Sequence, residues 1–141
     1  MHKLSIIVSV FNEEASIPMF YQELKNTLQN VDFEYDILFV NDGSTDQSLD
    51  KIREIKQQDS QVHLINFSRN FGHEAAMLAG IDFCTGDAAV CMDADLQHPP
   101  RSIIEMWTKF QEGFDVINMV RMDRQDGGFF RKVTSKAFYS I

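Results

Sequence analysis

Short apolar runs alternate with amphipathic stretches along this chain, and no other feature restricts its fold as much. The runs are rich in Ile, Val and Phe and have the length of buried parallel strands; they cover residues 4–10, 35–40, 62–67, 88–92 and 116–120. Four amphipathic stretches lie between them. Strands joined through helices predict an α/β fold with a doubly wound, mostly parallel sheet, right-handed crossovers and helices on both faces.

Each amphipathic stretch is expected to place one apolar face against the sheet. The first face comprises Ile17, Phe20, Tyr21, Leu24 and Leu28, and the second Leu49, Ile52 and Ile55 behind a possible capping box at residues 44–47. The third comprises Met77, Leu78, Ile81 and Cys84, stopped by Gly86. The fourth comprises Ile103, Ile104, Trp107 and Phe110, between Pro99-Pro100 and Gly113.

Size and composition fit one globular domain. The 141 residues are 44% hydrophobic, which is enough for a real core. The net charge of −8 argues against general nucleic-acid binding, because that function needs a basic face. No apolar run of membrane-spanning length and no signal peptide is present, so we expect this part of the protein to be soluble and cytosolic. Cys84 and Cys91 are expected to be reduced core thiols.

Polar residues follow every predicted strand. In open α/β sheets, ligands bind beyond the carboxyl ends of the strands, so these residues are expected to converge on one rim. The segments are Phe11-Asn12-Glu13-Glu14, then Asn41-Asp42-Gly43-Ser44-Thr45-Asp46, then Ser68-Arg69-Asn70-Phe71-Gly72-His73-Glu74, then the residues after Met92, and finally Arg121.

The fourth of these segments carries the clearest chemistry. Asp93, Asp95 and Gln97 alternate just where a strand gives way to a helix-starting Pro-Pro. Hard oxygen ligands of this kind suit Mg²⁺ or Mn²⁺, which take their remaining ligands from water and substrate phosphates. The pattern therefore suggests nucleotide diphosphate chemistry, although Asp-x-Asp alone is also compatible with a solvated turn.

Two common phosphate-binding motifs are absent from the chain. A Rossmann dinucleotide site would show Gly-x-Gly-x-x-Gly after the first strand, and a P-loop would show Gly-x-x-x-x-Gly-Lys. We therefore expect metal and arginine, in place of a glycine cradle, to meet the diphosphate charge.

Together the strand-end segments resemble the family 2 glycosyltransferases with the GT-A fold, and most closely the polyprenyl-phosphate group that includes dolichol-phosphate mannose synthases. The resemblance covers essentially the whole chain. It rests on four motifs in the right order: Val8-Ser9-Val10-Phe11-Asn12-Glu13-Glu14, Val40-Asn41-Asp42-Gly43-Ser44-Thr45-Asp46, Ser68-Arg69-Asn70-Phe71-Gly72-His73-Glu74 and Asp93-Ala94-Asp95-Leu96-Gln97-His98-Pro99-Pro100.

The resemblance implies a nucleotide site. Ser9, Phe11 and Glu13 look like its first loop, where the family often has Pro-x-Tyr-Asn-Glu; Phe11 keeps the stacking ring but lacks the hydroxyl. Asp42 is similar to the family aspartate that binds uracil, since a carboxylate accepts the imide N–H. The alternative for this segment is an Asx-turn residue that starts a helix, and this alternative fits Asp46 better than Asp42.

The same resemblance implies roles along the diphosphate. Asp93, Ala94 and Asp95 would lie along the ribose and diphosphate, with Asp95 and Gln97 ligating Mg²⁺ or Mn²⁺. Arg121 looks like the family arginine that meets the diphosphate or donor sugar; the alternative is a surface arginine that ends a strand. Asp93, Asp95 and Arg121 are thus the implied catalytic residues.

Two further residues and the histidines stay open. Arg69 and Asn70 are candidates to approach the diphosphate, and equally to hold their own loop in shape. His73 and His98 lie in predicted site loops, but neither has an obvious partner in the sequence.

The implied activity is inverting transfer of a sugar from a nucleotide diphosphate sugar, UDP-linked, to a polyprenyl phosphate such as undecaprenyl phosphate. A lipid phosphate oxygen is already anionic and needs little general-base help. Alternatives are transfer to a saccharide hydroxyl and a non-catalytic nucleotide-binding or scaffold module. A receiver domain is disfavoured, because Phe11-Asn12-Glu13 and Arg121 stand where it has an acidic pair and a lysine.

The end of the chain suggests that the protein is longer. Phe130, Val133, Thr134, Ala137, Phe138 and Ile141 are predicted to share one helical face, and the pattern stops without a cap. We expect residues 1–141 to be one domain that lacks its acceptor segment and membrane helices. Arg131, Lys132 and Lys136 would face an anionic membrane, placing the protein on the cytosolic side of the cell membrane; the alternative is an ordinary helix packed on the sheet.

Overall fold

The computed structural model of the chain describes residues 2–115, 117–121, 130–135 and 139–140. Strands and helices alternate as the sequence predicts through the first four strands. The strands are β1 (Lys3–Val10), β2 (Glu34–Asn41), β3 (Val62–Asn66), β4 (Ala88–Asp93), β5 (Ile117–Arg121), β6 (Phe130–Ser135) and β7 (Tyr139–Ser140). The helices are α1 (Ile17–Thr27), α2 (Ser48–Gln58), α3 (His73–Phe83) and α4 (Ser102–Gln111).

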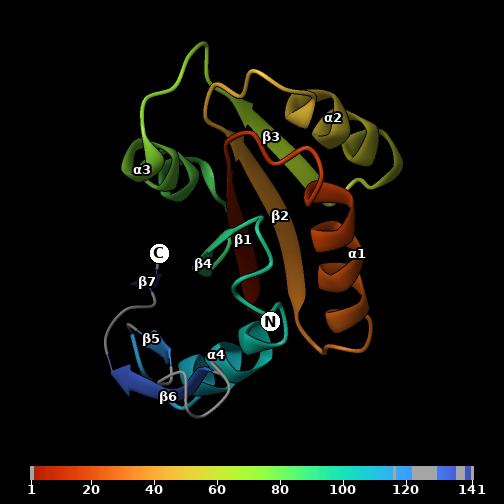
Figure 1. Cartoon of the computed structure of the whole chain (residues 1–141). Coiled ribbons are helices and arrows are strands. Elements are labelled where there is room, and N and C mark those ends of the chain that lie inside the picture. Colours follow the sequence, from red (N-terminus) through yellow and green to blue (C-terminus); the bar gives the residue numbers. More distant parts are fainter. Residues whose placement is uncertain (1, 116, 122–129, 136–138, 141) are drawn as a thin grey trace.

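A mostly parallel sheet forms the centre of the molecule. Its strand order is β3-β2-β1-β4-β7, with β1 to β4 parallel and β7 antiparallel to β4. Helices α1 and α2 lie on one side of the sheet and α3 on the other, as Figure 1 shows. The predicted doubly wound α/β architecture is therefore confirmed, and the carboxyl ends of the parallel strands share one edge.

The two faces of the sheet are packed differently. The larger core cluster joins even-numbered β1 residues such as Leu4 and Val8 to Phe20, Ile52 and Trp107 from three helices. The smaller cluster lies under α3, where Gly80 brings the helix so close to β1 that a Cβ would overlap the Ile7 side chain. The helix buries Ala76 and Gly80 and partly buries Met77 and Ile81, and it leaves Leu78 62% exposed, so the predicted inward position of Leu78 is wrong.

The ends of α4 follow the predicted signals. Ser102 N–H bonds to the Pro99 carbonyl, which starts the first turn, and Gly113 has a φ of 103° just past the last turn. In contrast, the possible capping box before α2 is absent: the Ser44 hydroxyl accepts the N–H of Asn12 instead.

The last part of the chain differs from the sequence prediction in two ways. Strand β5 does not extend the main sheet but pairs antiparallel with β6 in a separate two-stranded sheet. Residues 130–135, predicted as part of a helix, form that partner strand. Residues 136–138 and 141, which completed the predicted helical face, lie outside the described residues. Within the described residues, no helix has the length and apolar character needed to cross a membrane.

Candidate functional site

Loops that follow β1 and β2 are bonded to each other at the carboxyl edge of the sheet. The Asn12 side-chain oxygen accepts the N–H of Thr45 at 2.8 Å, and the backbone N–H of Asn12 donates to Ser44 Oγ at 2.9 Å. Asn12 has a φ of 52°, a left-handed conformation that asparagine tolerates better than most residues. Sequence reasoning assigned Asn12 no role; its side chain holds these two loops in register.

Asp42 organises the loop between β3 and α3. Asp42 is 2% exposed, and its carboxylate accepts N–H bonds from Phe71 at 2.7 Å and Gly72 at 3.1 Å and one from Asn70 Nδ2 at 3.2 Å. A Cβ on Gly43, whose φ is 70°, would overlap the backbone of the neighbouring loop. The Asp42 carboxylate therefore already serves protein donors, and a base could bond to it only by exchanging one of them.

The turn after β4 brings the predicted metal ligands to the same edge. Asp93 is the last residue of β4 and pairs in register with Ser9 of β1. Asp95 Oδ1 accepts the N–H of Gln97 at 3.1 Å, which leaves its second oxygen outside this bond, and Gln97 itself is exposed. Leu96 has a φ of 64°, so the turn is tight.

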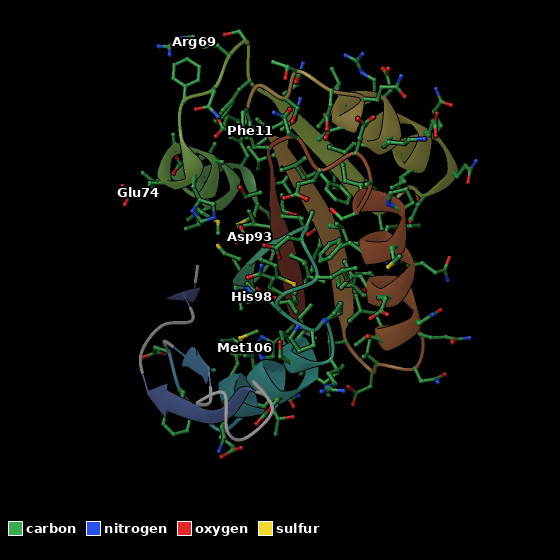
Figure 2. All side chains as sticks on the ribbon, viewed as in Figure 1. Phe11, Arg69, Glu74, Asp93, His98 and Met106 are labelled. Atoms are coloured by element: carbon green, nitrogen blue, oxygen red, sulfur yellow. The ribbon has the colours of Figure 1, made fainter. Side chains whose placement is uncertain are left out.

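Asp93 is bonded to α3. His73 Nε2 lies 2.8 Å from Asp93 Oδ1, and the two side chains are 56% and 36% exposed. Figure 2 shows Asp93 directed toward the α3 side of the sheet. Sequence reasoning left His73 without a partner because its partner lies 20 residues away on another element.

The remaining predicted nucleotide residues differ in how far a ligand could reach them. Ser9 is buried beside Asp93, and Phe11 is exposed at the rim. Ala94 is fully buried, so its backbone alone is available to a ligand. Glu13 faces α1, because its carboxylate accepts the Ser16 hydroxyl at 2.8 Å.

Arg69 and Asn70 shape their own loop. The Arg69 guanidinium lies 3.9 Å from the centre of the Phe71 ring and donates to the Asn70 carbonyl, while Asn70 Nδ2 bonds to Asp42. A hollow of about 550 Å³ lies beside this loop, and its lining includes Phe11, Asn41, Ser44, Asn66, Arg69 and Asn70. The structure thus shows the loop-holding alternative for both residues, next to a space open to a ligand.

Charged groups at this edge differ in how the protein holds them. Burial alone would raise the pKa of Asp46, but N–H bonds from Ser48 and Glu14 outweigh it and hold that pKa below its usual value. The N–H of Ser48, the first residue of α2, donates to Asp46 Oδ1 two residues earlier. This bond confirms the Asx turn predicted at Asp46. Two residues before Asp93, burial raises the pKa of the Cys91 thiol to about 11, which fits the predicted reduced core thiol.

For Arg121 the structure describes the backbone alone. Arg121 ends β5, which belongs to the separate two-stranded sheet, and its side chain lies outside the described part of the structure. Among the described residues, no group of three His, Cys, Asp or Glu side chains converges on a metal position. A cation at Asp95 and Gln97 would therefore need further ligands from water or substrate.

Sequence comparisons agree with the fold. The family model described as Glycosyl transferase family 2 matches residues 5–141. The chain is 47% identical over 137 residues to "Uncharacterized glycosyltransferase YkcC" of Bacillus subtilis. The aligned residues cover 97% of this chain and 42% of that protein. It is 39% identical over 139 residues to "Prophage bactoprenol glucosyl transferase homolog" of Escherichia coli, covering 99% and 45%. The chain thus spans less than half the length of these relatives.

Two solved structures share the fold. The mannosyltransferase PcManGT of Pyrobaculum calidifontis, in complex with GDP-Man and Mn²⁺, has a TM-score of 0.65 at 21% identity, covering 86% of this chain and 36% of that one. Residues 1–349 of Staphylococcus aureus TarS, in complex with UDP-GlcNAc, have a TM-score of 0.64 at 22% identity, covering 86% and 34%.

Proposed function

Because the chain belongs to glycosyl transferase family 2, we propose that it forms the donor-binding part of an inverting glycosyltransferase. The donor is a nucleotide diphosphate sugar, UDP-linked, and the acceptor is a polyprenyl phosphate such as undecaprenyl phosphate. The acceptor proposal is supported by a relative named as a bactoprenol glucosyl transferase homolog. The donor proposal is carried by one observation: Asp93, Asp95 and Gln97 form a tight turn at the carboxyl edge of the sheet.

The donor set of this turn fits a hard divalent cation, Mg²⁺ or Mn²⁺. Asp95 offers the carboxylate oxygen outside its bond to Gln97, and Gln97 offers an exposed carboxamide. With few protein ligands, the site suits a cation that shares the diphosphate of its substrate. Such a cation, when bound, would offset the charge that grows on the leaving diphosphate.

We place the nucleotide between the β4 turn and the loops after β1 and β3. Phe11 is exposed and supplies a ring on which a base can stack, and Ser9 lies beside Asp93 near the expected ribose. Uracil recognition by Asp42 requires the base N–H to replace a loop donor at that carboxylate. Arg69 carries a planar cation at the edge of the adjoining hollow, where diphosphate oxygens are suitable partners.

The proposed reaction is a single displacement. A phosphate oxygen of the lipid attacks the anomeric carbon, the bond to the nucleotide diphosphate breaks, and the configuration at that carbon inverts. The lipid phosphate is anionic at neutral pH, so no side chain has to remove a proton. Asp93 orients the donor. We propose that Arg121 is the arginine that contacts the diphosphate or the donor sugar.

This acceptor implies a membrane location. We propose that the complete protein acts at the cytosolic face of the cell membrane, with the basic positions Arg131, Lys132 and Lys136 near the anionic leaflet. Anionic lipid attracts each such residue by about 1 kcal/mol, so the segment would contribute to the orientation of the domain without anchoring it alone.

A transfer assay with the complete protein tests this function. We expect radiolabelled sugar to move from a UDP-sugar to undecaprenyl phosphate in the presence of Mn²⁺, and the Asp95→Ala variant to be inactive. Transfer to a saccharide hydroxyl with none to the lipid phosphate would contradict the acceptor. Donor binding without transfer to either acceptor would favour a non-catalytic nucleotide-binding module.

A further inference from the structure

The His73–Asp93 hydrogen bond joins the start of α3 to the end of β4, where the proposed donor site begins. His73 is the first residue of α3 and Asp93 the last of β4, and their side chains meet at 2.8 Å. A carboxylate accepts hydrogen bonds and cannot donate one, so His73 Nε2 must carry the proton in this contact. The bond fixes one oxygen of Asp93 and leaves the other, Oδ2, for a ligand.

Asp93 depends on this contact for its orientation. Among the described residues, His73 is the one group bonded to the Asp93 carboxylate. The Asp93 side chain is 36% exposed, and within the described part of the chain no backbone N–H bonds to its carboxylate. Without His73, the carboxylate would be free to rotate, and a ligand would have to order it at a cost in entropy.

His73 itself is held firmly from the other side. The N–H groups of Phe71 and Gly72, which immediately precede it, bond to the buried Asp42 carboxylate. The lack of a side chain at Gly80 lets α3 pack closely against Ile7 of β1. His73 therefore projects from a fixed helix end, and it transmits that fixed position to Asp93.

From this arrangement we propose that His73 is a positioning residue, which orients Asp93 so that its Oδ2 accepts a hydroxyl of the donor ribose. The proposal rests on the proposed nucleotide function of this edge. Residues that orient the ligands of a metal typically contribute about 10-fold to 100-fold in affinity or activity, and we take the same range as a guide for Asp93. We expect the lower end of that range, because Asp93 keeps partial access to solvent.

The test compares two nucleotides in calorimetry with the complete protein and Mn²⁺. UDP carries both ribose hydroxyls, and 2′,3′-dideoxy-UDP carries neither. We expect His73→Ala to weaken UDP binding about 10-fold and to leave the weaker binding of the dideoxy nucleotide nearly unchanged. In an Asp93→Ala background, His73→Ala should then change UDP binding by less than about twofold.

Variants at the same helix end control for folding. Gln places its N–H near the position of His Nε2, so His73→Gln should retain most of the UDP affinity, whereas His73→Asn is too short to reach Asp93 and should resemble His73→Ala. Glu74→Gln is the matched control. Glu74 is the next residue after His73 and is exposed, and Figure 2 shows it well apart from Asp93. We expect it to bind UDP as the parent does.

Results with the variants can overturn the proposal in three ways. The proposal is wrong if His73→Ala weakens both nucleotides equally, if its effect adds fully to that of Asp93→Ala, or if His73→Gln binds as poorly as His73→Asn. If the parent protein binds the dideoxy nucleotide as tightly as UDP, the ribose contact is absent and the proposal fails while the glycosyltransferase function stands. If the parent binds no nucleotide at all, both fail together.

Discussion

Asp59 and Asp93 are carboxylates at opposite edges of the same sheet, and the protein treats them differently. Asp59 lies before β3, where its two oxygens accept the Tyr21 hydroxyl at 2.6 Å, Lys25 Nζ at 3.1 Å and the N–H of Gln61 at 2.9 Å. Its side chain is 11% exposed. Asp93 ends β4, is 36% exposed and has His73 as its described partner.

The difference separates a structural carboxylate from one that we propose binds a ligand. Burial alone would raise the pKa of Asp59, but the bonds from Tyr21, Gln61 and Lys25 outweigh it and lower that pKa. Protein donors thus satisfy Asp59 completely. At the other edge, Asp93 and Asp95 each hold one oxygen in a protein bond and keep the other available, which is what a diphosphate site with a shared cation needs.

The largest expected effect is at the carboxyl edge. Asp95→Ala should weaken Mn²⁺-dependent UDP binding by about 100-fold or more, because it removes the one charged ligand proposed for the cation. The melting temperature should hardly change, since this exposed turn contributes little to the core. Isothermal titration with and without Mn²⁺ measures the effect, and Asp50→Ala, in the exposed first turn of α2, is the control. Unchanged affinity would remove Asp95 from the site.

The opposite result is expected at Asp59. Asp59→Ala should lower the free energy of unfolding by about 2 kcal/mol, because Tyr21 and Lys25 lose their shared acceptor. UDP affinity should stay within about twofold of the parent, since the residue is remote from the site. Urea denaturation and calorimetry give the two numbers. A large loss of UDP affinity in the folded variant would break the contrast between the two edges.

Asp42 is the one carboxylate for which we consider both a structural role and a ligand-binding role. Asp42→Ala should destabilise the fold by about 1–3 kcal/mol, because three loop donors lose their acceptor. If Asp42 also accepts the uracil imide, the parent should prefer UDP to CDP and the variant should bind both alike. Equal binding of UDP and CDP by the parent would leave Asp42 as a structural residue alone.

The smallest effect concerns pH. Burial and then the bond to Asp59 raise the pKa of Tyr21 from its ordinary 10.0 to about 12. Folding therefore favours the protonated phenol, so this stabilisation is complete below pH 10 and is lost as the pH rises toward 12. We expect the unfolding free energy of the parent to fall more steeply than that of Tyr21→Phe between those values, measured by urea denaturation. Parallel curves would show that Tyr21 ionises alike in both states.

Sequence patterns predicted the first four strands as short apolar runs and the four helices from the stretches between them, although α3 lacks a clear apolar face and Leu78 was placed on the wrong side. Residues 130–135 misled them, since Phe130, Val133 and Thr134 fit helical spacing and are also good strand formers. A short segment of this kind is decided by pairing, here with β5, which the sequence does not display.

The candidate site shows the same limit. Motifs placed Asp93, Asp95 and Gln97 correctly at a strand end, because strand ends follow from periodicity. The partner of His73 and the loop contacts of Asp42 join residues 20 or more positions apart, and such contacts depend on how the elements pack. Residue types alone therefore could not separate the carboxylate that holds a loop from those that keep an oxygen free for the proposed ligand.

A crystal structure of the protein with UDP and Mn²⁺, using the anomalous signal of manganese, would locate the donor site. We expect one strong anomalous peak within coordination distance of Asp95 and Gln97, next to the diphosphate, with the ribose beside Asp93. A nucleotide bound elsewhere, or a manganese peak away from the β4 turn, would contradict the claim that this edge of the sheet is the donor site.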